Sequence, residues 1–214
     1  KKGNTCLTFA VENNSIECVK TLLKNGVKPT QRIYNGDSML LLATSYGNDE
    51  IVQLLIGAGA QPGEAIMVSA VQGRDEFVRR LIQLSALAWP DAVNAVVPGT
   101  GGHPDDPDSG GNPLAAACVA GHKTVVTRLL ELGADPNHPI LVQGGTCALH
   151  VAVKKGYYDC VARLLEYGAN ANTIRPAREA GEQHVTALDL AEMGVLDLED
   201  SSVDFQKCAD ILRH

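Results

Sequence analysis

The chain has 214 residues, of which 45% are hydrophobic but only 4% aromatic. This aliphatic content excludes an intrinsically disordered chain and favours closely packed helices over a β-sandwich. No apolar run approaches the ~18 residues that a membrane span needs, so we expect no membrane insertion. The net charge is −7, and because the chain has no basic stripe, we do not expect it to bind nucleic acid.

A short helix is predicted to recur along the chain. The segments 3–10 and 36–43 match each other at a spacing of 33 residues. A Leu or Met three residues before an Ala occurs six times: Leu7/Ala10, Leu40/Ala43, Met67/Ala70, Leu114/Ala117, Leu149/Ala152 and Leu188/Ala191. This spacing places both residues on one face of a helix, where the small Ala lets the next helix approach.

A second, antiparallel helix is predicted to follow each of the first five short helices. Apolar residues stand eight and twelve residues after the Ala: Cys18/Leu22, Ile51/Leu55, Val78/Ile82, Val125/Leu129 and Cys160/Leu164. The helix then ends at Gly26, Gly59, Gly133 or Gly168, with Ala86 as the exception, and such a Gly provides a left-handed cap. One helix pair cannot bury its apolar face alone, so the pairs are expected to stack.

These repeated residues closely resemble the ankyrin repeat family. The fourth unit matches best, with Asn112–Ala117, Gly121-His122 and Gly133–Asn137. The resemblance implies an all-α fold, an ankyrin-repeat solenoid of stacked antiparallel helix pairs with projecting turns, as a single domain over 1–214. We expect six repeats at about 3–35, 36–62, 63–86, 110–143, 144–180 and 181–214, the third irregular and the sixth interrupted, with an insertion at 87–109.

The insertion divides into two parts. Residues 91–97 can form a short extra helix that Asp91 caps or Pro90 precedes. Residues 98–111 are rich in Gly, Pro and Asp and predict no regular element. Asp105, Asp106 and Asp108 lack the ligand spacing and the bidentate Glu of a calcium loop, so we expect no metal and no cofactor.

The cysteines and histidines are expected to be structural. The six cysteines form no CxxC pair, and we expect reduced thiols in a cytoplasmic protein, with the nucleus as the alternative. Cys18, Cys160 and Cys208 fall at one core position, whereas Cys6 and Cys147 are expected to be more exposed at helix starts. The resemblance implies structural roles for His122 and His150. We find no Cys/His or Ser/His/Asp set whose register would bring catalytic groups together.

In the family, partners lie in a concave groove formed by the first helices and the projecting turns. Here the helix positions of that groove hold Glu12, Asn13, Ser45, Tyr46, Gln72, Val119, Ala120, Lys154 and Lys155, and the turn positions hold Tyr34, Asn35, Asp37, Asp108, Ser109, Gln143 and Thr146. Tyr34 and Tyr46 are either an aromatic hot spot or two ordinary surface tyrosines. Lys154 and Lys155 are either a site for an acidic motif or a solvated pair.

The sequence therefore predicts a non-catalytic protein–protein interaction module. Its groove is expected to bind a protein or peptide segment, and the chain to be part of a larger scaffold or adaptor protein. The alternative is a structural spacer packed against other domains of a larger enzyme or channel. The sequence does not indicate the partner or the oligomeric state, because a fold alone does not name them.

Overall fold

The computed structural model describes residues 5–30, 33, 38–97, 111–140, 147–175, 185–196 and 205–213. Their secondary structure is almost entirely helical. The α-helices are α1 Cys6–Glu12, α2 Ile16–Lys24, α3 Met39–Tyr46, α4 Asp49–Gly57, α5 Gly63–Val71, α6 Asp75–Ser85, α7 Pro113–Ala120, α8 Lys123–Glu131, α9 Ala148–Lys154, α10 Tyr158–Glu166, α11 Ala187–Leu196 and α12 Phe205–Leu212. A 3-10 helix, η1, spans Ala92–Asn94, and β1 Ile174–Arg175 pairs antiparallel with β2 Val185–Thr186.

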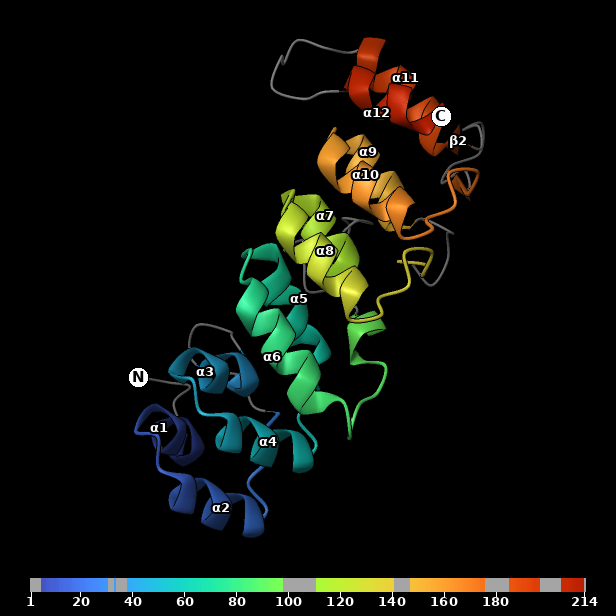
Figure 1. The fold of residues 1–214 in the computed structure, drawn as a ribbon. Helices are drawn as coiled ribbons and strands as arrows, with labels where there is room; N and C mark the ends of the chain where they lie inside the picture. Colours follow the sequence, from blue (N-terminus) through green and yellow to red (C-terminus); the bar gives the residue numbers. More distant parts are fainter. Residues whose placement is uncertain are drawn as a thin grey trace, which may run out of the picture.

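Consecutive helices form antiparallel pairs that stack from α1/α2 at one end to α11/α12 at the other (Figure 1). The odd-numbered first helices pack on one another in one layer, and the even-numbered second helices pack in the other. This arrangement confirms the predicted all-α solenoid. No helix in the described ranges is long and apolar enough to cross a membrane.

The chain reverses between the two helices of a pair at one left-handed residue. In the first five pairs this residue is Asn14, Gly47, Gly73, Gly121 or Gly156, with φ between 54° and 77°. In the first, third, fourth and fifth pairs the next amide donates a hydrogen bond back to the carbonyl five residues before it, as in His122 N to Ala117 O and Tyr157 N to Ala152 O, both 3.0 Å. We call the position of this carbonyl the Ala slot, because Ala10, Ala43, Ala117 and Ala152 occupy it.

In the third pair, the structure shifts the repeat register that we predicted from the sequence by one residue. Arg74 N donates to Ser69 O at 2.9 Å, so Ser69 occupies the Ala slot and the predicted Met67/Ala70 pair is wrong. Ile66 takes the position of the repeated Leu, and both Ile66 and Ser69 are fully buried. The same shift places Phe77, Leu81 and Ser85 at the second-helix positions that we assigned to Val78, Ile82 and Ala86. The prediction failed because Met and Ala match the repeat pattern better by residue type than Ile and Ser.

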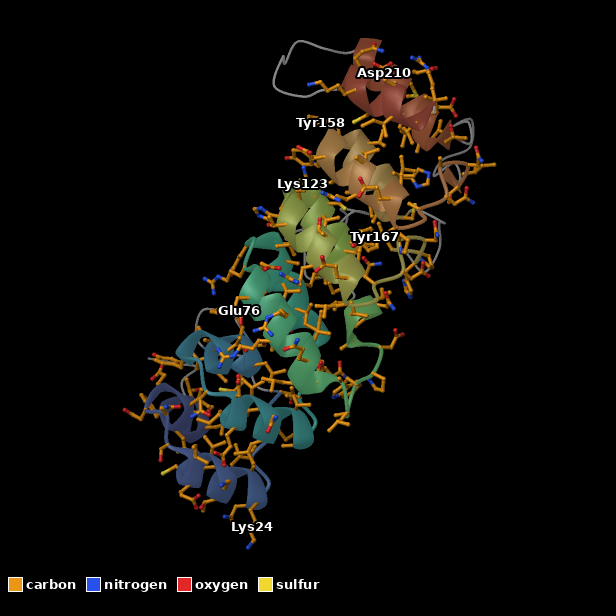
Figure 2. All side chains as sticks on the ribbon, viewed as in Figure 1. Lys24, Glu76, Lys123, Tyr158, Tyr167 and Asp210 are labelled. Atoms are coloured by element: carbon orange, nitrogen blue, oxygen red, sulfur yellow. The ribbon has the colours of Figure 1, made fainter. Side chains whose placement is uncertain are left out.

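Side chains on the second helices connect neighbouring pairs through ion pairs. They are Lys20–Glu50 at 3.0 Å, Asp49–Arg80 at 2.7 Å, Asp75–Arg128 at 3.3 Å and Lys123–Asp159 at 2.5 Å. Lys123 lies on the outer surface of α8 (Figure 2). All eight side chains are at least a quarter exposed, so each pair contributes at most about 1 kcal/mol.

Side chains of the following pair cover the left-handed turns. Arg80 donates to Gly47 O at 2.7 Å, the His122 ring lies on Gly73, and the Tyr157 ring lies on Gly121. A Cβ built on Gly121 would stand 2.9 Å from Cζ of Tyr157. The turns at Gly73 and Gly121 therefore favour glycine for two reasons, the positive φ and the close ring.

The insertion differs from the predicted extra helix. Within its described residues, which end at Val97, only Ala92–Asn94 is helical, as the 3-10 turn η1, and Val97 then pairs with Gly111 in an antiparallel bridge. Ala95 and Val97 pack against Gly63, at the start of α5. Asn94 Oδ1 accepts a hydrogen bond from Asp135 N at 2.9 Å, as Asn137 Oδ1 does from Asn170 N at 2.7 Å. Asn94 of the insertion thus makes the same kind of hydrogen bond to the next turn that Asn137 makes one repeat later.

Two predicted cysteine environments are wrong. Cys18 is exposed, although Cys160 and Cys208 are buried as predicted. The first pair packs only its other side on α3 and α4, so Cys18 and Phe9 line an open hollow of about 770 Å³. Cys147, expected near the surface, is buried at the start of α9. Cys6 is exposed as predicted.

Replacing Gly121 with Ala is expected to destabilise the chain more than replacing Gly133 with Ala. Both glycines have positive φ, 72° and 91°, but only Gly121 has a ring where the Cβ would stand. The left-handed conformation costs about 1–2 kcal/mol in each variant, and the clash adds about 1–3 kcal/mol for Gly121→Ala. Urea unfolding measures both. Equal losses would show that the Tyr157 ring moves aside freely.

Ser69→Ala is expected to raise the free energy of unfolding by about 1 kcal/mol. The Ser69 hydroxyl is buried and has no hydrogen-bond partner among the described residues, whereas the other pairs place Ala at this slot. Ser45→Ala is the control, because that hydroxyl is exposed and donates to Leu42 O. A loss of stability in Ser69→Ala would show that the hydroxyl has a partner in the folded protein.

Candidate functional site

Two residues at the end of each first helix lie just before the left-handed turn. They stand two and three positions after the Ala slot, on α1, α3, α5, α7 and α9. We call this set the first-helix row: Glu12, Asn13, Ser45, Tyr46, Val71, Gln72, Val119, Ala120, Lys154 and Lys155. The first helices of neighbouring pairs pack side by side, so the row crosses consecutive repeats (Figure 1).

The helices hold this row on rigid supports. The repeated Leu position of each first helix is less than 2% exposed in all five pairs. Several of these helices are also capped: Ser38 Oγ accepts from Leu41 N at 3.3 Å, and Asn112 Oδ1 accepts from Ala115 N at 2.8 Å. The turn hydrogen bonds to the Ala slot fix the other end.

The row is apolar in the middle and positively charged on α9. Tyr46 is 52% exposed, Val71 47% and Val119 38%, although large apolar side chains are usually buried. Lys154 and Lys155 are both exposed. An exposed apolar stretch beside charged groups can bind another polypeptide, because its burial removes apolar surface from water.

The structure places five of the predicted site residues in this row: Ser45, Tyr46, Gln72, Lys154 and Lys155. The other six predicted residues, Tyr34, Asn35, Asp37, Asp108, Ser109 and Gln143, lie outside the described residues. The pairing of Tyr34 with Tyr46 therefore stays a prediction. Asp105, Asp106 and Thr146 also lie outside these ranges.

Sequence reasoning missed Val71 as a site residue. The register predicted from the sequence placed Val71 directly after the core residue Ala70, at a position where the other repeats have buried residues. Counting back from Gly73, the left-handed residue of that pair, gives Val71 the same row position as Val119. A glycine-based alignment of the repeats would have found it.

Cys147 and His150 correct the expectation that no Cys/His set comes together. Cys147 Sγ lies 3.2 Å from His150 Nδ1. The Cys147 amide donates to the same nitrogen at 3.4 Å, and His150 Nε2 lies 2.9 Å from Thr173 O. With Nδ1 accepting from the Cys147 amide, Nε2 is the nitrogen that donates to Thr173 O.

The buried pair is suited to structure rather than to nucleophilic attack. Burial raises the pKa of the Cys147 thiol, so the thiol keeps its proton at neutral pH. His122 has a structural role as well, since its Nε2 lies 2.9 Å from Val71 O. Within the part of the chain that the structure describes, no three His, Cys, Asp or Glu side chains could hold a metal ion together.

A family model described as Ankyrin repeats (3 copies) matches residues 1–65, 40–139 and 66–175. The chain belongs to the ankyrin repeat family. Ankyrin repeats are a protein–protein interaction module. The solved ankyrin repeat domain of Bcl-3 agrees in fold, with a TM-score of 0.59 and 23% identity over the whole of both chains.

The curated relatives are much longer proteins. Ankyrin repeat and KH domain-containing protein mask-1 of Caenorhabditis elegans is 31% identical over 143 residues, which are 63% of this chain and 5% of that protein. Glycerophosphocholine phosphodiesterase gde1 of Schizosaccharomyces pombe is 45% identical over 63 residues, 29% of this chain and 6% of that one. Ankyrin repeats thus occur in relatives with very different names, one of them that of an enzyme.

Alkylation of the native protein at neutral pH is expected to modify Cys6 and Cys18 and to spare the four other cysteines. Those two thiols are exposed and the others are buried, and burial raises the pKa of Cys160 to about 11. Since the thiolate is the nucleophile, a raised pKa slows the reaction. Mass spectrometry after iodoacetamide treatment measures this, with the urea-unfolded chain as the control. Equal labelling of Cys18 and Cys160 in the native chain would contradict the structure.

Proposed function

We propose that this chain is a non-catalytic interaction module that binds a segment of a partner protein along the first-helix row. The observation that carries the proposal is that Tyr46, Val71 and Val119 are exposed within this row. Val71 and Val119 stand at the same position on α5 and α7, and Tyr46 stands one position later on α3. The groove predicted from the sequence includes Tyr46 and Val119, and the corrected register of the third pair adds Val71. The chain then serves as the binding part of a larger scaffold or adaptor protein. Its repeats have the boundaries that we predicted from the sequence.

The physical basis is a surface that is already formed before the partner arrives. Helix packing and the turn hydrogen bonds hold the row in place, so binding orders few groups of this chain. A small number of anchors then supplies most of the affinity, and a half-exposed tyrosine is a typical one. The buried Cys147 thiol supports a non-catalytic role, because its raised pKa keeps it protonated and leaves no thiolate beside His150.

We also propose a reducing compartment for this protein, the cytoplasm or the nucleus. Five cysteines, Cys6, Cys18, Cys118, Cys147 and Cys160, are free thiols, and such thiols persist where glutathione and thioredoxin keep them reduced. The domain could then meet partners of that compartment, which is where a scaffold or adaptor acts.

Tyr46→Ala and the double variant Lys154→Glu/Lys155→Glu are expected to reduce partner capture without lowering the melting temperature. All three side chains are exposed, so surface substitutions there change stability by at most about 0.5 kcal/mol. Quantitative mass spectrometry of proteins retained by the immobilised chain from an extract of the source cells measures capture. We expect at least one protein to fall about tenfold or more with both variants, the equivalent of about 1.4 kcal/mol.

The matched control is Lys24→Glu/Lys28→Glu, which changes the charge by the same amount. Lys24 lies in the last turn of α2, at the far end of the stack from α9 (Figure 2). The control variant is expected to retain the captured proteins. If the row variants also retain all of them, the row is not the binding site, and cross-links from the row to other domains of the full-length protein would support the spacer alternative.

A further inference from the structure

We propose that the first-helix row recognises a segment in the polyproline II conformation that carries two apolar side chains and one acidic side chain, each three residues from the last. The two apolar side chains contact Val71 and Val119, and the acidic side chain lies over Lys154 and Lys155. This inference rests on the proposed function and specifies the chemistry of the partner.

The apolar part of the site comes from two equivalent positions on adjacent helices. Val71 on α5 and Val119 on α7 both stand two residues after the Ala slot, and they are 47% and 38% exposed. The helices beneath them are lined by small buried residues, among them Ser69, Ala116 and Ala117, which allow close packing. The two valines therefore offer two apolar contacts one helix step apart.

The charged part of the site lies one further step along the row. Lys154 stands at the same position on α9 as Val119 on α7, and Lys155 follows it; both are exposed. The lysines give this end of the row a positive charge within a half of the chain, residues 86–214, that has nine basic and seventeen acidic side chains. A carboxylate is the complementary group, and its attraction to two ammonium groups weakens with salt.

The distance between helices selects the conformation of the partner. Packed helices lie about 8–10 Å apart. In a polyproline II helix, every third side chain points the same way, about 9.3 Å further along. In a β-strand, side chains on one face are about 6.7 or 13 Å apart, and neither spacing fits. The step of the row therefore matches three residues of polyproline II.

A polar side chain beside Val71 suits a backbone of this kind. A polyproline II segment has no internal hydrogen bonds, so its carbonyls need other partners. Gln72 follows Val71 at the end of α5 and is exposed. Its amide group can donate to a carbonyl of the bound segment. Because polyproline II is already populated in free peptides, binding also orders the segment at low entropic cost.

A fluorescein-labelled peptide, Gly-Leu-Pro-Ser-Leu-Pro-Ser-Glu-Gly, is the probe, together with the same residues in reverse order. The comparison peptide has one extra Ser between the two Leu residues, which places the second Leu and the Glu out of step. Fluorescence anisotropy with the full 214-residue chain measures both. We call the two probes without the extra Ser in-step, and each is compared with the same peptide containing the extra Ser. We expect the in-step probe that binds better to bind at least about tenfold more tightly than its extra-Ser version, the equivalent of about 1.4 kcal/mol.

Charge exchange identifies the end of the row that reads the acidic residue. The in-step probe with Lys in place of Glu is expected to bind the native chain weakly and Lys154→Glu/Lys155→Glu strongly. Val119→Asp is expected to weaken every in-step probe about tenfold, and Lys24→Glu/Lys28→Glu to weaken none. Circular dichroism melting of each variant checks that the fold is kept, and the charge exchange stands as the test if Val119→Asp fails to fold.

Equal binding of in-step and out-of-step probes, or no binding of either, would overturn the proposal. Preferred binding of a peptide with its Leu residues seven apart would also overturn it, because seven residues of an α-helix span about 10.5 Å. In each of these cases the proposed function stands if the row variants still lose a natural partner. If they lose none, the proposed function fails as well.

Discussion

The architecture depends on one backbone interaction, the hydrogen bond that closes the left-handed turn onto the Ala slot. In the turn after α7, Gly121 adopts φ of 72° and the following amide donates to Ala117 O. This bond directs the second helix back along the first, so each pair contributes one helix to each of the two layers of the stack. Because the turn ends each first helix at the same distance from its buried Ala or Ser, it also sets where the exposed row begins.

Interactions between pairs turn these units into one stack. The ring of Tyr157 covers the turn at Gly121, and Arg80 bonds the turn at Gly47. Each such contact places a side chain of the next repeat over the turn before it. Where packing covers one side only, as at α1 and α2, the core position opens and Cys18 is exposed.

The same regularity produces the candidate binding surface. A periodic fold repeats a surface position at each helix step, so a row of side chains acquires a fixed spacing without any dedicated loop. The chemistry of the row then changes along the stack, from Tyr46 through the two valines to the lysines of α9. A linear partner with its own matching period can read that change.

The sequence by itself determined the helix pairs, their order and the burial of Cys160 and Cys208, because repeated apolar spacing and helix-ending glycines are local signals. It also located most of the first-helix row. Only the tertiary structure decided the register of the third pair, where Ser69 rather than Ala70 accepts the turn hydrogen bond. It also decided the exposure of Val71 and Cys18 and the contact of Cys147 with His150. The exposure of Cys18 and the contact of Cys147 with His150 depend on which neighbour covers a residue, and residue type and spacing along one chain do not contain that information. The register of the third pair had one sequence signal, Gly73, but the match of Met67 and Ala70 to the repeat pattern outweighed it.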